Sequence, residues 1–191
     1  MELQQFRDSI KSMMGEYRYR HSLGTEAVAC DLALIHGYDT RKASIAGILH
    51  DCAKDLSDEA LIKECIRYHL PISEYERQSV FLLHAKVSSA YAEDLFEIKD
   101  EDILSSIRYH TTGRPGMSLL EKIIFISDYI EPNRKQIEDI DRIRWEAYNH
   151  LDRAVILTLD HTLKYLESTG SVIDPLTREA YEYYNALYKE D

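Results

Sequence analysis

The dipeptide His50-Asp51 is the feature of this sequence that most directly indicates chemistry, because it follows the apolar stretch 45–49 (IAGIL). Burying a carboxylate in such surroundings costs several kcal/mol unless a cation or hydrogen bonds compensate it. A metal ion is the simplest cation that accepts an imidazole nitrogen and a carboxylate oxygen together. The pair therefore predicts a metal site.

Further histidines and an aspartate fall on apolar helix faces. Asp128 follows Ile124 by four residues, and His110 follows Ile107 by three, so both are predicted to point inward. One such residue alone is more often a satisfied core histidine, a cap or an ion-pair partner. Together they favour one site assembled from several helices. The candidates are His21, His50, Asp51, His84, His110 and Asp128.

Composition limits the class of protein and of partner. The chain has 191 residues, 45% of them hydrophobic, with only 7 Gly and 4 Pro, which favours helices over a turn-rich β fold. The net charge of −11 disfavours extended nucleic acid as a partner. A small polyanion can still bind where a metal and a few Lys or Arg side chains reverse the local charge.

Targeting features are not evident in the sequence. The three cysteines form no CxxC pair, the first residues form no apolar signal segment, and no stretch is long enough for a membrane span. We expect a cytoplasmic protein with reduced thiols and no membrane partner.

Helical periodicity covers almost the whole chain, and alternating strand patterns are nearly absent. Helices are predicted over 2–14, 17–35, 40–53, 58–69, 84–97, 101–111, 119–131, 138–148, 149–169 and 175–189. Thr40, Ser57 and Ser118 are the predicted caps of three of them. We expect an all-α, single-domain helical bundle over residues 1–191, with a core over about 17–135 and C-terminal helices over 138–189 packed on it.

The order of these residues resembles a known superfamily. His21, His50-Asp51 and Asp128 are arranged as in the HD superfamily of metal-dependent phosphohydrolases. The surrounding strings 50–54 (HDCAK), 110–117 (HTTGRPGM) and 127–134 (SDYIEPNR) are similar to the bacterial YqeK-type symmetrical bis(5′-nucleosyl)-tetraphosphatases. The resemblance runs from about Tyr17 to about Arg178.

This resemblance implies an HD-domain helical bundle that hydrolyses diadenosine tetraphosphate to two ADP, with a dinucleoside polyphosphate or nucleoside diphosphate as its small-molecule partner. It implies iron, or another transition metal such as manganese, cobalt or zinc, as the cofactor. The implied metal ligands are His21, His50, Asp51 and Asp128. The implied substrate-binding residues are Lys54, His84, His110, Thr111, Arg114 and Arg134.

The expected mechanism is attack of a metal-activated water on an inner phosphorus. Asp51 is expected to orient or deprotonate the water, and Lys54 to bind a phosphate. His84 and His110 are expected to contact bridging oxygens or to donate a proton to the leaving phosphate. The alternative for these two histidines is a second metal ion. The expected catalytic residues are thus Asp51, Lys54, His84 and His110.

Two other functions remain open at this point. The chain could be another HD-type nucleotide phosphohydrolase, although it lacks the Gly-Tyr-Pro tripeptide typical of cyclic-dinucleotide phosphodiesterases. It could also be a non-catalytic nucleotide-binding sensor with a structural metal. Structural metal sites tend to be closed, whereas the four expected ligands leave coordination positions open, which argues against this alternative. A homodimer formed through the Tyr-rich C-terminal helix is possible.

Overall fold

Every regular element is a helix in residues 2–134 and 139–188, the part of the chain that this computed structural model describes. The prediction of an all-α, single-domain fold is confirmed. The α-helices are α1 (Leu3–Met13), α2 (Glu16–Ile35), α3 (Thr40–Leu49), α4 (Asp58–Arg67), α5 (Glu74–Gln78), α6 (Leu83–Asp94), α7 (Glu101–Tyr109), α8 (Leu119–Ile130), α9 (Ile140–Asn149), α10 (Leu151–Thr169) and α11 (Pro175–Leu187). A short 3₁₀ helix, η1 (Val80–Leu82), precedes α6.

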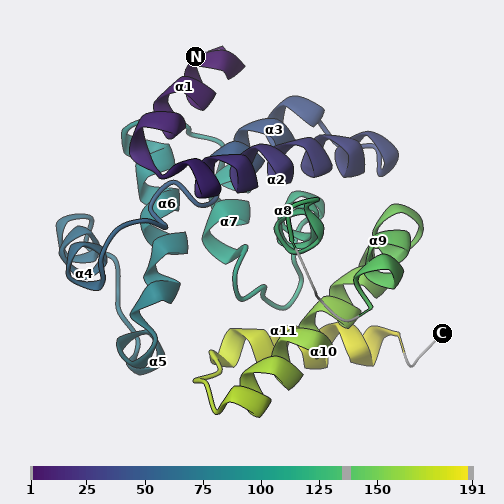
Figure 1. The fold of residues 1–191 in the computed structure, drawn as a ribbon. Coiled ribbons are helices and arrows are strands. Elements are labelled where there is room, and N and C mark those ends of the chain that lie inside the picture. The colour runs from purple at the N-terminus through teal and green to yellow at the C-terminus, as the bar shows by residue number, and fades with distance from the viewer. Residues whose placement is uncertain (1, 135–138, 189–191) are drawn as a thin grey trace.

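Helix α8 lies at the centre of the fold (Figure 1). It packs against α2, α3, α7, α9 and α10, so it is covered on most of its circumference. Its sequence fits that position, because Leu120, Ile123, Ile124 and Ile126 are all fully buried. A helix that is apolar nearly all round belongs inside a protein. A polar side chain on α8 that points into the core is therefore an exception that calls for a chemical reason.

Helices α2 and α3 approach each other closely. A Cβ atom added to Gly47 of α3 would lie 2.8 Å from the Cα atom of Glu26 on α2, so only glycine fits there. The small residue before His50 thus admits a neighbouring helix. This contact fixes the relative position of the helices that carry His21 and His50.

The predicted helix over 40–53 is shorter in the structure. It ends at Leu49, and His50 is its C-cap, followed by a turn. Its N-cap is Asp39 rather than Thr40, because the Asp39 carboxylate accepts hydrogen bonds from the backbone N–H groups of Arg41 and Lys42. His50 and Asp51 therefore stand at the end of this helix, in the turn that follows it.

The short helix α5 was not predicted. Its signal is nevertheless present, because Ser73 and Glu76 form a capping box in which each side chain bonds the other residue's backbone N–H. The predicted caps Ser57 and Ser118 are confirmed. Positions 138 and 189, at which two predicted helices begin or end, lie outside the described residues.

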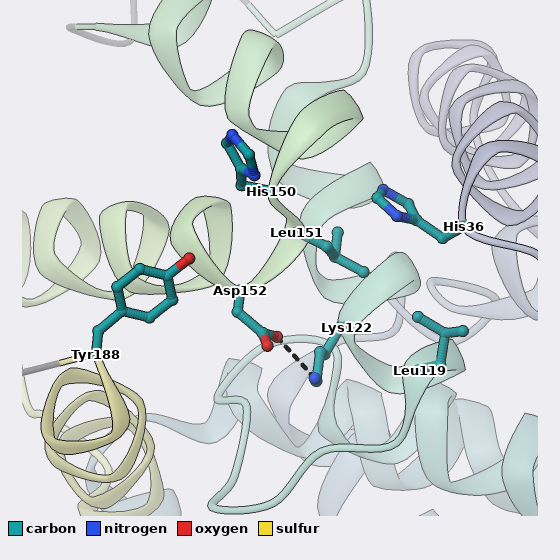
Figure 2. A pocket seen from close by; sticks show the side chains of 7 residues that line it. All are labelled: His36, Leu119, Lys122, His150, Leu151, Asp152 and Tyr188. Atoms are coloured by element: carbon teal, nitrogen blue, oxygen red, sulfur yellow. Dashed lines mark hydrogen bonds and ion pairs between the residues drawn. The ribbon is translucent and has the colours of Figure 1, made fainter. Parts of the chain in front are cut away.

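The C-terminal helices pack on the central helix through α10, which contacts α8, α9 and α11. A hollow of about 250 Å³ lies where the end of α2 meets α8, α10 and Tyr188 (Figure 2). The predicted boundary near residue 135 falls on residues outside the described part. Within that part, each helix is too short or too polar to cross a membrane.

Candidate metal centre

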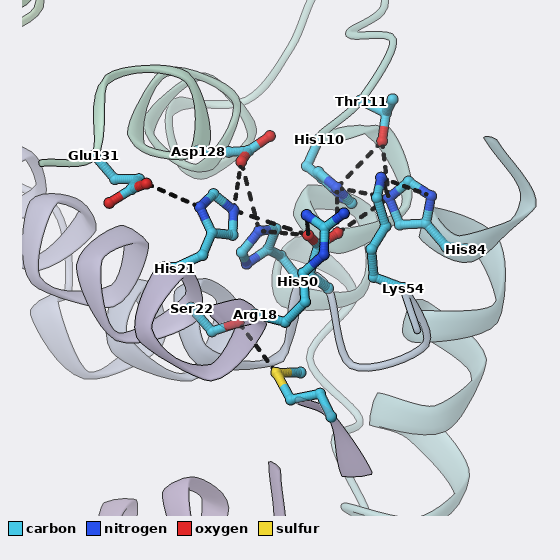
Figure 3. A network of polar contacts seen from close by, with 12 residues as sticks. Arg18, His21, Ser22, His50, Lys54, His84, His110, Thr111, Asp128 and Glu131 are labelled. Atoms are coloured by element: carbon cyan, nitrogen blue, oxygen red, sulfur yellow. Dashed lines mark hydrogen bonds and ion pairs between the residues drawn. The ribbon is translucent and has the colours of Figure 1, made fainter. Parts of the chain in front are cut away.

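Six polar side chains from five helices meet beside the core (Figure 3). His21 comes from the first half of α2, His84 from the start of α6, and Asp128 from the last turns of α8. The remaining residues stand where helices end: His50 and Asp51 at the end of α3, and His110 at the end of α7. The structure therefore brings together all six residues that sequence analysis singled out as candidate ligands.

The first group of candidate ligands contains the four residues of the expected metal set. The Nε2 atom of His21 lies 2.8 Å from Oδ1 of Asp128 and 3.8 Å from Oδ2 of Asp51. The Nε2 atom of His50 lies 3.7 Å from each of the same two oxygens. Ligand atoms of His21, His50 and Asp51 all lie within 4.8 Å of one another, a spacing that a single ion can span.

The second group shares Asp51 with the first. Oδ1 of Asp51 lies 3.1 Å from Nε2 of His84 and 3.3 Å from Nε2 of His110. These two nitrogens are 3.2 Å apart. Asp51 thus presents one oxygen to one pair of histidines and the other oxygen to the second pair.

Each of the four imidazoles is held by a hydrogen bond at Nδ1. The Nδ1 partners are the carbonyl oxygen of Gly47 for His50 (2.7 Å), of Ile107 for His110 (2.7 Å) and of Phe81 for His84, and the carboxylate of Glu131 for His21 (3.1 Å). Because an acceptor at Nδ1 requires a proton there, the neutral imidazole exposes its Nε2 lone pair to the cluster. This is the orientation that protein ligands adopt toward metals.

Sequence analysis missed Glu131, which orients His21. Glu131 is almost fully buried, and its other carboxylate oxygen accepts a hydrogen bond of 2.7 Å from the backbone N–H of Asn133. A Cβ atom on Gly24 would lie 2.5 Å from this carboxylate, so a glycine in α2 makes the room that Glu131 needs. Its position one turn after Asp128 was a signal that could have identified it.

Charges within the cluster are strongly coupled. Burial alone would lower the pKa of His21, but the carboxylates of Asp128 and Glu131 outweigh it and raise that pKa to about 9. A metal ion bound there takes the place of a proton. Burial and the ammonium group of Lys54 lower the pKa of His84 to about 4, so this imidazole is neutral near pH 7. The pKa of Asp51 lies well below its ordinary value despite burial, because of His50, His110 and His84.

The donor set fits a cation. Among the described residues, Nε2 of His50 and Oδ1 of Asp51 are buried atoms without a hydrogen bond. Around Asp51, imidazole lone pairs face carboxylate lone pairs, an arrangement that is unfavourable unless a positive charge lies between them. Nitrogen and oxygen donors in this combination suit iron, zinc and similar transition metals.

Cationic side chains surround the cluster. Lys54 Nζ lies 2.9 Å from Nε2 of His84, and Nη2 of Arg134 lies 2.7 Å from Oδ1 of Asp128. Arg18, which sequence analysis missed, places Nη1 3.9 Å from Oδ2 of Asp51. The centre of an acidic protein thereby becomes a place where a polyphosphate can bind.

Of the other two expected substrate residues, the structure brings only one to the cluster. The hydroxyl oxygen of Thr111 lies 3.1 Å from Nε2 of His110. Arg114 instead forms two hydrogen bonds of 2.9 Å with the buried carboxylate of Glu121 and lies over the ring of Tyr109. The positive charge of Arg114 is therefore paired with a carboxylate of the protein itself.

The sequence of this chain is similar to known proteins over nearly its whole length. Residues 18–133 match the HD domain family. The chain is 41% identical to the symmetrical bis(5′-nucleosyl)-tetraphosphatase of Halalkalibacterium halodurans over 90% of this chain and 91% of that protein. It is 37% identical to the protein of the same name from Bacillus subtilis, over 91% and 92%.

A solved structure has the same fold. The crystal structure of a predicted HD superfamily hydrolase involved in NAD metabolism, from Clostridium acetobutylicum, superposes with a TM-score of 0.94, at 39% identity and 98% coverage of both chains. The matched family, the near-complete coverage and the His/Asp cluster agree with one another. The chain belongs to the HD-domain family, in the group of proteins named symmetrical bis(5′-nucleosyl)-tetraphosphatases.

Proposed function

We propose that this protein hydrolyses diadenosine tetraphosphate symmetrically to two ADP, using a metal-activated water. The observation that carries the proposal is the cluster itself: four imidazoles turn Nε2 toward two carboxylates, with cationic side chains around them. The relatives named for this reaction match the chain over nearly its whole length.

The metal is proposed to be iron, held by His21, His50, Asp51 and Asp128. The distances among these four residues and the anchored Nδ1 atoms of both histidines support this ligand set. When bound, such an ion supplies Lewis acidity and lowers the pKa of water from its bulk value toward ~7. Manganese, cobalt and zinc accept the same donors, so the metal content of purified protein decides among them.

A second metal ion is proposed for His84, His110 and Asp51. Both histidines donate from Nδ1 to a backbone carbonyl, which leaves Nε2 as an acceptor. An acceptor nitrogen binds a metal but does not bind a phosphate oxygen. The lowered pKa of His84 supports the same assignment, because it disfavours His84 as a proton donor near pH 7.

Charge neutralisation of the tetraphosphate is assigned to Lys54, Arg134 and Arg18. All three cations contact the cluster, and two of them are arginines, which can bind phosphate oxygens in a bidentate manner. Asp51 is proposed to position the reacting groups as a shared ligand. Both of its oxygens face imidazoles, so neither is free to act as the general base.

The decisive experiment is metal analysis under anaerobic conditions combined with turnover of diadenosine tetraphosphate in the same preparation. Two ADP as the product support the proposal; ATP plus AMP, or no reaction, would refute it. A single-turnover measurement with excess protein separates a slow enzyme from a nucleotide sensor.

Counting metal ions in His84→Ala and His110→Ala tests the second site. Loss of one ion per chain in each variant is the expected result. Unchanged metal content with lost turnover would instead assign both histidines to the substrate.

A further inference from the structure

A second cavity, of about 360 Å³, lies next to the metal cluster. Its walls come from α5, η1, α6, the end of α7 and the start of α11. Much of the wall is apolar, including Leu82, Ala85 and Leu176. Charged residues also line it, namely Glu76, Lys86, Arg108, Asp174 and Glu179. Its size falls within the range of roughly 300–1,000 Å³ that is common for small-molecule sites.

Thr111 joins this cavity to the cluster. Its side chain lines the cavity, and its hydroxyl oxygen lies 3.1 Å from Nε2 of His110. Thr111 therefore contacts both the cavity and the cluster.

The lining suits a nucleoside. Tyr109 is one of the wall residues, and the guanidinium of Arg114 lies 5.3 Å from its ring centroid, which holds the ring in place. An aromatic ring and aliphatic side chains bind the faces of a purine base. The carboxylate of Glu179 can accept hydrogen bonds from ribose hydroxyls, and Arg108 can pair with a phosphate.

Part of the cavity wall comes from outside the region that matches the HD domain. The HD domain match ends at residue 133, whereas Asp174, Pro175, Leu176 and Glu179 come from α11 and its N-cap. Chemistry at the cluster is supplied by the HD domain, and part of the cavity by a helix beyond it. A substrate with two nucleosides needs such an additional site, and one with a single nucleoside does not.

We propose that this cavity binds the second nucleoside of the dinucleoside polyphosphate, with α11 as the element that confers the preference for two nucleosides. The proposal rests on the proposed function. It assigns one ADP unit to the cavity side of the cluster and the other to the opposite side.

Filling the cavity tests the assignment. Leu176→Trp and Glu179→Trp each add a large side chain to the lining, at a half-buried and an exposed position of α11. Leu187→Trp places the same side chain on the exposed far end of α11 and is the matched control. Two measurements are made on metal-loaded protein: the KM for diadenosine tetraphosphate and the number of ADP molecules bound at saturation by equilibrium dialysis.

The expected result is a rise in KM of about tenfold or more in both cavity variants, with kcat changed less, and none in the control. ADP binding should fall from two per chain to one in the cavity variants only. A wild-type chain that binds one ADP, or cavity variants that keep two ADP and an unchanged KM, would overturn the assignment. If the wild type does not hydrolyse diadenosine tetraphosphate, the proposed function fails, and the ADP count still decides whether the cavity binds a nucleotide.

Discussion

Two regions of this molecule gather histidine, aspartate and a cation, and they differ in whether their polar atoms already have partners. In the hollow between α8, α10 and Tyr188, His36 donates from Nε2 to the carbonyl of Ala147 (2.7 Å), and Lys122 pairs with Asp152 (2.7 Å) (Figure 2). In the metal cluster, the histidines satisfy Nδ1 and turn Nε2 toward carboxylates (Figure 3).

The difference shows that residue types alone do not define a metal site. In the hollow, Nε2 of His36 is bonded to a backbone carbonyl, and the carboxylate of Asp152 is paired with the ammonium group of Lys122. In the cluster, Nε2 of His50 and Oδ1 of Asp51 are buried without a hydrogen bond, and a cation between such lone pairs lowers their free energy. A metal site is distinguished by buried nitrogen and oxygen lone pairs that no hydrogen-bond donor of the folded protein satisfies.

Removing a carboxylate from each region should give the largest contrast. We expect Asp128→Ala to abolish metal binding and to lower turnover by at least about 1,000-fold, because a ligand and the partner of His21 are lost. Asp152→Ala in the hollow should leave both properties unchanged. Metal analysis, turnover and far-ultraviolet circular dichroism of the two variants provide the comparison. Full metal content in Asp128→Ala would refute the ligand assignment.

Arg114 should behave like the paired residues of the hollow. Its partner Glu121 is 1% exposed, so Arg114→Ala leaves a buried carboxylate without its cation. We expect a loss of about 2–3 kcal/mol in the free energy of unfolding, with kcat/KM of the folded protein little changed. Urea denaturation measures the first quantity, and Arg142→Ala, an exposed arginine on α9, is the control. A stable variant with much weaker substrate binding would return Arg114 to the phosphate site.

The sequence predicted those parts of the structure that depend on local pattern. Asp128 stands at helical spacing from the apolar residues of α8, and Ser118 caps that helix as its capping box requires. The partners of Glu131 and Arg114 could not be predicted in this way. The space beside Glu131 depends on Gly24, more than a hundred positions earlier, and Arg114 pairs with Glu121 across the loop that precedes α8. Both arrangements follow from packing, which periodicity does not encode.

Glu131 tests whether the residue that bonds Nδ1 of a metal-binding histidine affects the metal affinity. Glu131→Gln keeps the shape of the side chain but removes the charge that orients His21. We expect metal affinity to fall about 10- to 100-fold, with the fold retained. Competition with a metal chelator measures the affinity, and Glu146→Gln, a buried glutamate on α9, is the matched control. Equal affinities in the two variants would mean that the Nδ1 partner of His21 has no influence on the metal.

Glu76 provides the smallest test, because its buried carboxylate is satisfied by donors rather than by a metal. Burial alone would raise the pKa of Glu76, but hydrogen bonds from Lys86 and Ser73 outweigh it and hold the pKa below the ordinary value of 4.5. A carboxylate with a lowered pKa in the folded state stabilises the protein above its unfolded-state pKa, and this contribution disappears as the pH falls through the folded-state pKa. Glu76→Gln should therefore cost about 1 kcal/mol at pH 7 and progressively less below pH 4.5. Urea denaturation at several pH values measures the difference, with the exposed neighbour Glu74→Gln as the control. A cost that stays constant with pH would show that the charge of Glu76 does not stabilise the fold.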